Sequence, residues 1–490
     1  MQNLDAMPVW VRRAPPWVLS GVFHLILALI ATVLVFTEAP AEAREVQIQP
    51  AARERVDWED RTLPPRFVKR PKVPLPDIRE TPRVVLDPEE LVVEIAKGDP
   101  EEITDKFIEH DVGLRDPFGI GGRPVGHAGL PDGMEGRERE RGSLGGHVPQ
   151  LELGQEWLAK HQSKDGSWKC AGFQEECDGN KCSGTGFAGY DVGVTALAVL
   201  AFTGVGNTPW HGKHRKVVRK AVRWLISQQE KDGAIGRSEA EGWMYNHAIA
   251  TMALCEVRAM AGAHRHTLIR PTQAAVNFCL RAQNPDLAWR YESRSGDNDT
   301  SVTGWMLLAL KAARMADIEV PDETFRSARA FLDRVTHSTG IAGYRGMDGE
   351  SSYLAMQEGM YEAIPTMTAV SVLCRRLTGQ SKKDSKIREG VSVLLESLPD
   401  PAGRLVNHYY WYYGTYALFQ ASRGPHDPRW KKWHRAVIKA LIPAQNTDSA
   451  VGEAGSWAPT GEWGIAGGRV YSTAINLLTL EATFRYERMD

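Results

Sequence analysis

Six short apolar segments rich in small residues recur along the last two-thirds of this 490-residue chain. Each follows an amphipathic segment that ends in a turn containing glutamine or glycine, as in residues 157–168 and 224–233. A repeat of about fifty residues is a supersecondary unit that buries its apolar face only by stacking on neighbouring units. The pattern therefore predicts an all-α fold of stacked helical hairpins. The recurring segments begin at Thr195, Ala250, Thr303, Thr368, Thr415 and Thr473.

The composition of the two helix types predicts that the hairpins close into an (α/α)6 toroid over residues 150–486. A narrow face of Ala, Thr and Gly lets the inner helices approach one another closely, while the amphipathic helices fill the rim. In each turn we expect the glutamine to bond the exposed backbone at a helix end, and the tryptophan to pack over it. These turns are predicted to tie one hairpin to the next.

A 20-residue apolar run at residues 17–36 predicts one transmembrane helix, because it is long enough to cross a hydrocarbon core of roughly 30 Å. Arg12 and Arg13 precede the run and acidic residues follow it, which predicts a cytoplasmic segment at residues 1–16. The remainder would then lie outside an inner membrane, in a periplasm-like space. The alternative is a cleaved signal peptide ending near residues 41–43, although signal peptides usually have apolar cores of about 7–15 residues.

Two polar residues, Ser20 and His24, lie four apart and share one face of this predicted helix. The pattern Arg-Arg-x-Pro-Pro-Trp-x-x-Ser-x-x-x-His, which ends at His24, resembles the start of TonB-type energy-transducing proteins. That resemblance implies contact with a proton-driven motor in the membrane. The alternative is an ordinary single-pass anchor that tolerates a histidine.

Residues 37–149 have the composition of a linker, with prolines spaced through a charged stretch and glycines concentrated before the folded body. The charge of the chain is balanced, with 59 basic and 61 acidic side chains. No basic stripe interleaved with aromatic residues is present, so we expect no nucleic-acid partner.

The repeat carries a family resemblance. Gly154-x-x-Trp157-Leu158-x3-Gln162-x3-Gly166-x-Trp168 resembles the QW repeat of squalene and oxidosqualene cyclases, and residues 455–457 repeat its ending. The resemblance covers the whole predicted ring. It is also similar to exported bacterial proteins with prenyltransferase and squalene oxidase repeats. It implies an α/α toroid with a central cavity, and a terpene cyclase or mutase activity of the isomerase class.

The catalytic acid of such cyclases is the middle Asp of Asp-x-Asp-Asp-Thr, which protonates an alkene or epoxide. This chain has Gly-Asp297-Asn298-Asp299-Thr300, which puts asparagine at the proton donor or else loses the last aspartate. Asp299 and Asp297 are the candidate catalytic residues. The alternative for Asp299 is the N-cap of an inner helix, a role that Asp191 and Asn246 would share in the first two units.

Two related activities are excluded because the sequence lacks the motifs that they require. Protein prenyltransferases bind zinc through an Asp-x-Cys pair, and thioester domains need Cys-Gly-Glu-Gln; neither motif occurs here. His247 follows one predicted N-cap position and is a candidate acid or base, with a purely structural histidine as the alternative. We expect no cofactor.

Aromatic residues concentrate at the starts of the inner helices, where they would line the cavity. Such rings stabilise carbocations, stack on sugars or contact lipid chains. Some of them must serve as core packing, because five consecutive aromatics on a helix cannot all face inward. The candidate substrate-binding residues are Trp243, Tyr245, Trp305, Tyr410, Trp411 and Tyr471.

Three cysteines, Cys170, Cys177 and Cys182, cluster after the first QW turn. In an exported protein they predict one disulfide and one remaining thiol. A zinc site is the alternative, and it would need a fourth ligand such as Asp178; we expect no metal.

Three functions remain open on the sequence. The first is a terpenoid or lipid cyclase with an altered acid. The second is a non-catalytic protein that binds an isoprenoid or lipid, or acts as a scaffold. The third is a polysaccharide-active or glycan-binding ring.

Overall fold

The computed structural model describes residues 148–490, apart from residues 178–181, 239–241, 286, 347–364, 402–405, 449–451, 487 and 490. The predicted membrane segment with Ser20 and His24, and most of the predicted linker, lie outside the described residues. Within the described part of the chain, none of the helices combines the length and apolar character needed to span a membrane.

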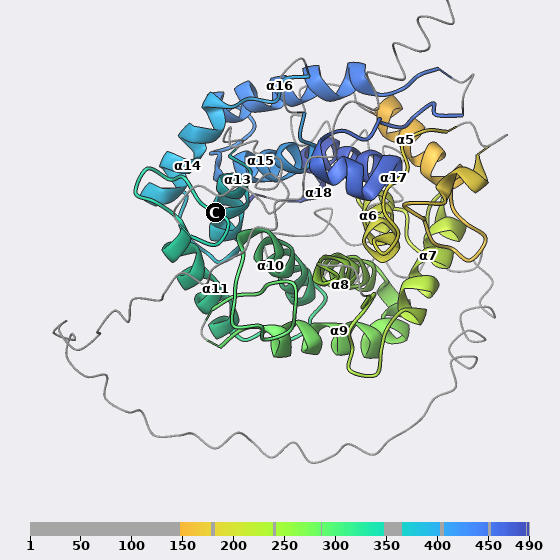
Figure 1. The fold of residues 1–490 in the computed structure, drawn as a ribbon, viewed down its shortest axis with the longest axis horizontal. Coiled ribbons are helices and arrows are strands. Elements are labelled where there is room, and N and C mark those ends of the chain that lie inside the picture. The colour runs from red at the N-terminus through yellow and green to blue at the C-terminus, as the bar shows by residue number, and fades with distance from the viewer. Residues whose placement is uncertain are drawn as a thin grey trace, which may run out of the picture. The chain divides into compact units, whose positions relative to one another are not determined.

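Six helices form an inner ring, in which each helix packs against the next and the last, α17, packs against the first, α6 (Figure 1). This closure confirms the predicted toroid. Nearly every inner-helix residue is buried, as in α6, where all residues after Asp191 are covered. The inner helices are α6 (Asp191–Thr203), α8 (Met244–Ala259), α10 (Thr300–Met315), α13 (Thr366–Leu377), α15 (His408–Ala421) and α17 (Gly461–Leu480).

Six outer helices surround this ring, each preceding its inner partner in the chain (Figure 1). They are amphipathic: α7 buries Val218, Ala221, Val222 and Leu225, which share one helix face, and exposes its basic residues. The outer helices are α5 (Val148–Lys160), α7 (Arg215–Ser227), α9 (Ile269–Ala282), α11 (Asp322–Val335), α14 (Ser385–Glu396) and α16 (Pro428–Ala444).

Glycines allow the inner helices to approach one another closely. A Cβ atom on Gly193 of α6 would lie 2.8 Å from Oδ1 of Asn246 on α8. A Cβ atom on Gly304 of α10 would lie 2.6 Å from Cγ1 of Val370 on α13. Larger residues at these points would push neighbouring inner helices apart, which explains the small-residue pattern seen in the sequence.

Glutamines in four of the described turns tie one hairpin to the next, as predicted. The side chain of Gln162 donates to the carbonyl oxygens of Gly166 in its own turn and Val217 in the next outer helix, both at 2.9 Å. The last turn closes the ring through Gln445, which donates to the carbonyl oxygen of Gln150 in α5 at 2.9 Å. Two intermediate turns use Gln229 and Gln283 in the same way.

The turn tryptophans are fully buried and fasten each turn to its own outer helix. The indole N–H groups of Trp168, Trp289 and Trp457 donate to the carbonyl oxygens of Leu158, Cys279 and Leu441, all at 2.8 Å. In return, the backbone amide of Trp168 donates to the inner-helix hydroxyl of Thr195 at 2.9 Å. Thr303 and Thr473 accept from the backbone amides of Trp289 and Trp457 in the same way, so these threonines join their inner helices to the turns.

The C-terminal segment packs against the inner ring. Arg485, in the short helix α18 (Ala482–Arg485), is buried between Glu256 of α8 and Glu481, and Tyr486 donates to Glu256 at 2.6 Å. Arg376 also donates to the carbonyl oxygen of Met489 at 2.7 Å. The contacts of the ring therefore continue to Met489.

Candidate functional site

A cavity lies where the inner helices begin. Its lining comes from α6, α8, α10, α15, α17 and the turn before α6, and is predominantly aromatic and aliphatic. The cavity has a volume of about 60 Å³. The lining residues are Tyr190, Gly193, Val194, Leu197, Tyr245, Asn246, Ile249, Trp305, Tyr409, Trp463, Ala466, Gly467 and Tyr471.

Aromatic contacts hold the lining together. The ring of Trp463 lies 5.3 Å from that of Tyr245 and 5.7 Å from that of Tyr409. Trp305 lies 6.4 Å from Tyr409 and stacks on Tyr412 at 5.5 Å. Offset and edge-to-face contacts of this kind fix ring orientation, so the aromatic faces at the cavity are pre-positioned.

Three of the six candidate substrate-binding residues line the cavity: Tyr245, Trp305 and Tyr471. The other three do not. Trp243 donates to Glu292 at 3.0 Å beneath the guanidinium of Arg237, and Tyr410 donates to the carbonyl oxygen of Ser397 at 2.7 Å.

Trp411 is buried beside His408 and is also absent from the lining. Sequence reasoning did not select Tyr190, Tyr409 or Trp463 as binding residues, although all three lie at or next to inner-helix starts.

Asp299 has the structural role considered for it. It is the N-cap of α10, where its Oδ1 accepts from the backbone amide of Val302 at 2.7 Å. Its other oxygen, Oδ2, is buried without a hydrogen-bond partner in the described part of the chain. Burial raises the pKa of Asp299 to about 7, against the backbone hydrogen bonds and the charge of Arg290, which lower it. The carboxyl group is therefore neutral over much of the pH range in which most aspartates are charged.

Tyrosine hydroxyls gather around this carboxyl group. Tyr409, on the cavity wall, shares a hydrogen bond of 2.7 Å with the hydroxyl of Ser301, and Tyr291 and Tyr344 bond to each other through their hydroxyls. The hydroxyl of Tyr245 is buried with no hydrogen-bond partner among the described residues. Burial raises the pKa of Tyr245, and the nearby Tyr344 and Asp299 contribute to the rise.

Asp297 and Asn298 have structural surroundings. Asp297 is partly exposed and pairs with Arg290 and Arg345, each at 2.8 Å. The side-chain oxygen of Asn298 accepts from the backbone amide of Ala288 at 2.9 Å and thereby orders the turn. Neither residue lines the cavity. Of this sequence motif, Asp299 is the member that combines burial with an unpartnered oxygen.

Asp191 and Asn246 do not cap helices through their side chains, contrary to the prediction. Asp191 is the first residue of α6, and its Oδ1 accepts from the backbone amide of Cys170 at 2.8 Å. Asn246 lies inside the first turn of α8 and accepts from the backbone amide of Gly193. Asp191 therefore bonds to the loop before α6, and Asn246 bonds to the start of the neighbouring inner helix α6.

His247 is fully buried on the outer side of α8. Its Nδ1 accepts from the backbone amide of Ile235 at 3.1 Å, and its Nε2 lies 3.2 Å from the sulfur of Cys279 in α9. In the second unit it thus binds the turn backbone as Thr195 does in the first. Burial lowers the pKa of His247 to about 3, so the imidazole is neutral, and it does not line the cavity.

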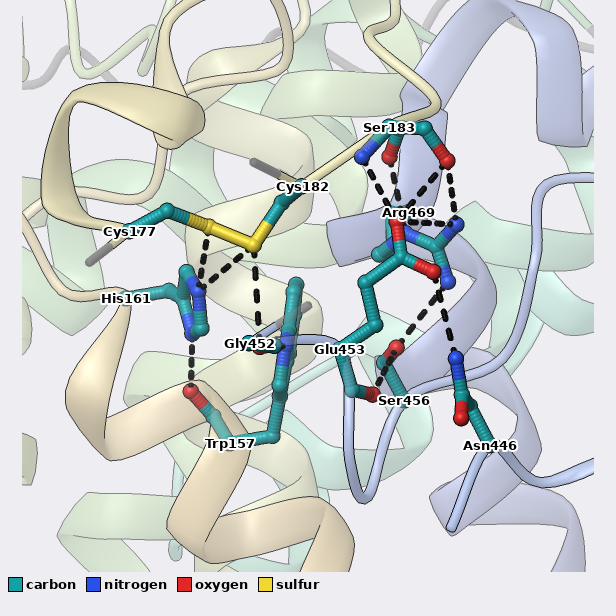
Figure 2. Close-up of a disulfide and its surroundings, with 10 residues drawn as sticks. All are labelled: Trp157, His161, Cys177, Cys182, Ser183, Asn446, Gly452, Glu453, Ser456 and Arg469. Carbon is teal, nitrogen blue, oxygen red and sulfur yellow. Dashed lines mark hydrogen bonds and ion pairs between the residues drawn. A yellow bond between two sulfur atoms is a disulfide. The ribbon is translucent and has the colours of Figure 1, made fainter. Parts of the chain in front are cut away.

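The cysteine cluster lies at the junction of the first and last hairpins (Figure 2). Cys177 and Cys182 form a disulfide, and Cys170 is a buried free thiol, in agreement with the prediction of one disulfide and one thiol. His161, at the end of the first outer helix, places its Nε2 3.0 Å from the sulfur of Cys177 and 3.3 Å from that of Cys182. Asp178, the other predicted ligand, lies outside the described residues.

No family model and no curated protein matches this chain. Several solved structures align with it at low similarity. A type II terpene cyclase from Scytonema, in complex with merosterolic acid A, shares 13% identity over 71% of this chain and 99% of its own, with a TM-score of 0.44.

Two carbohydrate-active proteins align equally well. An inactive variant of an α-1,6-mannanase from Salegentibacter, in complex with α-1,6-mannotriose, shares 9% identity over 68% of this chain and 98% of its own, with a TM-score of 0.47. An α-amylase from Clostridium perfringens shares 10% identity over 68% and 97%, with a TM-score of 0.43. Similarities at this level carry no argument about activity.

Proposed function

We propose that the ring binds one lipid of isoprenoid or acyl type, with its apolar chain in the aromatic cavity and its polar end at Asp299 and Tyr245. The observation that carries this proposal is the combination of an apolar lining with two buried polar atoms that lack partners among the described residues. One is Tyr245 Oη, on a lining residue, and the other is Oδ2 of Asp299, which is not a lining residue but interacts electrostatically with Tyr245. Buried polar atoms are normally hydrogen-bonded, because leaving one unpaired costs roughly 1–3 kcal/mol. A ligand with a hydroxyl or carbonyl end would satisfy both.

The neutral, protonated form of Asp299 determines which polar group a ligand can present to it. A protonated carboxyl group donates one hydrogen bond, whereas a carboxylate only accepts. Because its pKa is about 7, Asp299 can donate to an oxygen of the ligand without placing a charge in an apolar site. An uncharged oxygen, such as an alcohol or ester oxygen, suits this donor.

The residues that line the cavity favour a lipid ligand over a carbohydrate ligand. A sugar needs many hydrogen bonds, and glycoside hydrolysis needs two carboxyl groups facing one bond. Asn246 already donates to the carbonyl oxygen of Gly189 at 2.8 Å and accepts from Gly193, so its amide is committed to the fold. Asp297, the nearest acidic residue in sequence, is paired with two arginines.

The weak acidity of Asp299 supports lipid binding over cyclisation as the function. Protonation of an alkene requires a strong acid, and a carboxyl group whose pKa is raised to about 7 is a weak one. In one of the two alignments with the cyclase motif, Asn298 takes the place of the proton donor, and its side chain is bonded to the turn. The cavity volume of about 60 Å³ also suits the end of a linear chain better than a fused-ring product.

The predicted N-terminal anchor fits a lipid ligand. A transmembrane helix at residues 17–36 and a linker at residues 37–149 would hold the ring near an inner membrane, on its periplasmic side. The lipid would then pass between the bilayer and the cavity over a short distance. In this proposal, Ser20 and His24 are the residues that would contact a motor protein in the membrane.

The test uses the full-length protein in detergent, incubated separately with a linear isoprenoid alcohol, a fatty alcohol and a neutral oligosaccharide, and examined by native mass spectrometry. One unaltered lipid per chain supports the proposal. A cyclised product would replace it with a cyclase, and binding of the oligosaccharide alone would replace it with a glycan-binding ring.

Two variants locate the ligand. Ala466→Phe fills the cavity and is expected to abolish lipid retention. The matched control is Tyr410→Phe, since Tyr410 lies on an inner helix but bonds to the Ser397 backbone away from the cavity. Equal retention by wild type and Ala466→Phe would place the lipid elsewhere.

A further inference from the structure

We propose that His161, Cys177 and Cys182 form a binding site for a thiolate-seeking metal ion such as Zn²⁺ when the disulfide is reduced. Metal-ligating atoms of these three residues lie within 4.8 Å of one another, and all three side chains are buried. The site shares no residue with the lining of the central cavity. It is therefore independent of the proposed lipid binding.

The hydrogen bonding of His161 identifies the ring nitrogen that faces the sulfurs. Nδ1 lies 2.7 Å from the carbonyl oxygen of Trp157, and this contact requires the proton on Nδ1 (Figure 2). In the neutral imidazole, Nε2 then carries a lone pair directed at both sulfurs, at 3.0 and 3.3 Å. Metal-ligating histidines are held in the same way, with the second ring nitrogen donating to a backbone carbonyl or carboxylate.

The disulfide does not account for this arrangement. A disulfide carries no S–H proton, so neither sulfur can donate to the lone pair of Nε2. Two thiolates and this imidazole, by contrast, are three of the four ligands of a tetrahedral zinc site, with a solvent molecule as the fourth. In such a site the nitrogen and each sulfur are about 3.6 Å apart and the two sulfurs about 3.8 Å apart. Both sulfurs can therefore stay close to His161, but they must move away from each other once the disulfide bond is reduced.

The residues around these three side chains are themselves held in place by contacts between the first and last hairpins. The ring of His161 stacks on Trp157 at 4.1 Å, and Trp157 donates to the carbonyl oxygen of Gly452 in the last hairpin at 3.1 Å. Ser183, next to Cys182, bonds through its amide to Glu453 at 2.6 Å, and Arg469 pairs with Glu453 at 3.0 Å. The sulfur atoms therefore lie at the junction where the first and last hairpins close the ring.

The position is specific to the first unit. In the other turns that contain the tying glutamine, the residue corresponding to His161 is Gln228, Ala282 or Ala444. The Cys-containing insertion likewise follows only the first turn among these. A metal or a disulfide would thus fasten the same junction under reducing or oxidising conditions.

The conversion needs a dithiol reductant. The reductant gives two electrons and two protons to the Cys177–Cys182 bond, which yields two thiols and the oxidised reductant. Zn²⁺ then binds the two sulfurs and Nε2 of His161, and two protons leave to solvent. No other group changes its oxidation state.

The experiment uses the full-length protein in detergent. It is reduced, separated from the reductant without oxygen, mixed with Zn²⁺ and desalted, and the retained metal is measured. The expected result is one zinc ion per reduced chain and none per oxidised chain. In the same sample, zinc should protect two thiols from alkylation, as counted by intact mass.

Two variants complete the test. His161→Gln is expected to bind zinc at least tenfold more weakly, while Cys170→Ser, which removes the neighbouring free thiol, should retain it. No zinc in the reduced wild type, equal affinity in His161→Gln, or loss of zinc in Cys170→Ser would overturn the proposal. The alkylation count on the wild type decides the matter if a variant fails to fold.

Discussion

Asp299 accepts a hydrogen bond from the backbone amide of Val302 through one carboxyl oxygen, while its other oxygen is buried without a partner in the described part of the chain. The first contact is an N-cap, which explains why the residue suits the start of α10. The unpaired second oxygen lowers the stability of the free protein and suggests that a ligand bonds to it. A structural and a functional role thus share one side chain, and they can be separated by substitution.

Replacement of Asp299 by Asn should make the protein less sensitive to pH. The pKa of Asp299 is raised from 3.8 to about 7 in the folded state, so its stabilising effect is complete below pH 3.8 and lost as the pH rises through 7. Asparagine keeps the cap but has no charge. Between pH 4 and 8, the free energy of unfolding of the wild type should fall by about 4 kcal/mol relative to Asp299→Asn. Urea unfolding at both pH values measures this difference.

The control for that experiment is Asp299→Ala, which removes the cap as well as the charge. We expect it to cost about 1 kcal/mol relative to Asp299→Asn at every pH. If the wild type and Asp299→Asn show the same pH dependence, Asp299 ionises normally and the neutral carboxyl group is refuted.

Tyr245→Phe should stabilise the free protein and weaken lipid binding. The hydroxyl of Tyr245 is buried without a partner among the described residues, so its removal should raise the free energy of unfolding by about 1 kcal/mol. The same change removes a proposed contact to the ligand. Thermal unfolding and lipid titration on one sample measure both effects. A variant that is more stable and binds lipid as the wild type does would show that Tyr245 does not contact the ligand.

The ring closure should depend on Gln445. Its side chain donates to backbone oxygens in the first outer helix and in its own turn, both at 2.9 Å. Gln445→Ala leaves these acceptors unpaired and should cost about 1–3 kcal/mol. The matched control is Gln228→Ala, because the half-buried side chain of Gln228 bonds only to a neighbouring serine among the contacts described. Its effect should stay within about 0.5 kcal/mol; equal losses in denaturant unfolding would contradict this assignment.

His247→Leu should lower stability without affecting lipid binding. The substitution removes the acceptor of the Ile235 amide, which should cost about 1–3 kcal/mol at neutral pH. Since the folded-state pKa of His247 is lowered from 6.5 to about 3, the wild type loses stability as the pH falls below 6.5. The gap between the two proteins should therefore narrow in acid.

The exposed His266 provides the comparison for that experiment, and His266→Leu should change little. Loss of lipid binding in a folded His247→Leu protein would assign His247 to the site after all. Circular dichroism together with lipid titration distinguishes these outcomes.

The sequence by itself determined the architecture. The number of hairpins, the division into inner and outer helices and the tying role of the turn glutamines all follow from local patterns. Helix periodicity, small residues and turn chemistry act within one hairpin or between two neighbours. Gln162 and Trp168 accordingly make the contacts expected of them.

The tertiary structure decided which polar residues form sites. Asp297 and Asp299 are two residues apart, yet Asp297 meets Arg345 from a later unit while Asp299 is buried. His161 precedes the cysteines in an ordinary helical segment, and only the fold turns the insertion back onto it. Burial and charge pairing depend on neighbours distant in sequence, so desolvation, pKa and ligand geometry could not be predicted from the local pattern.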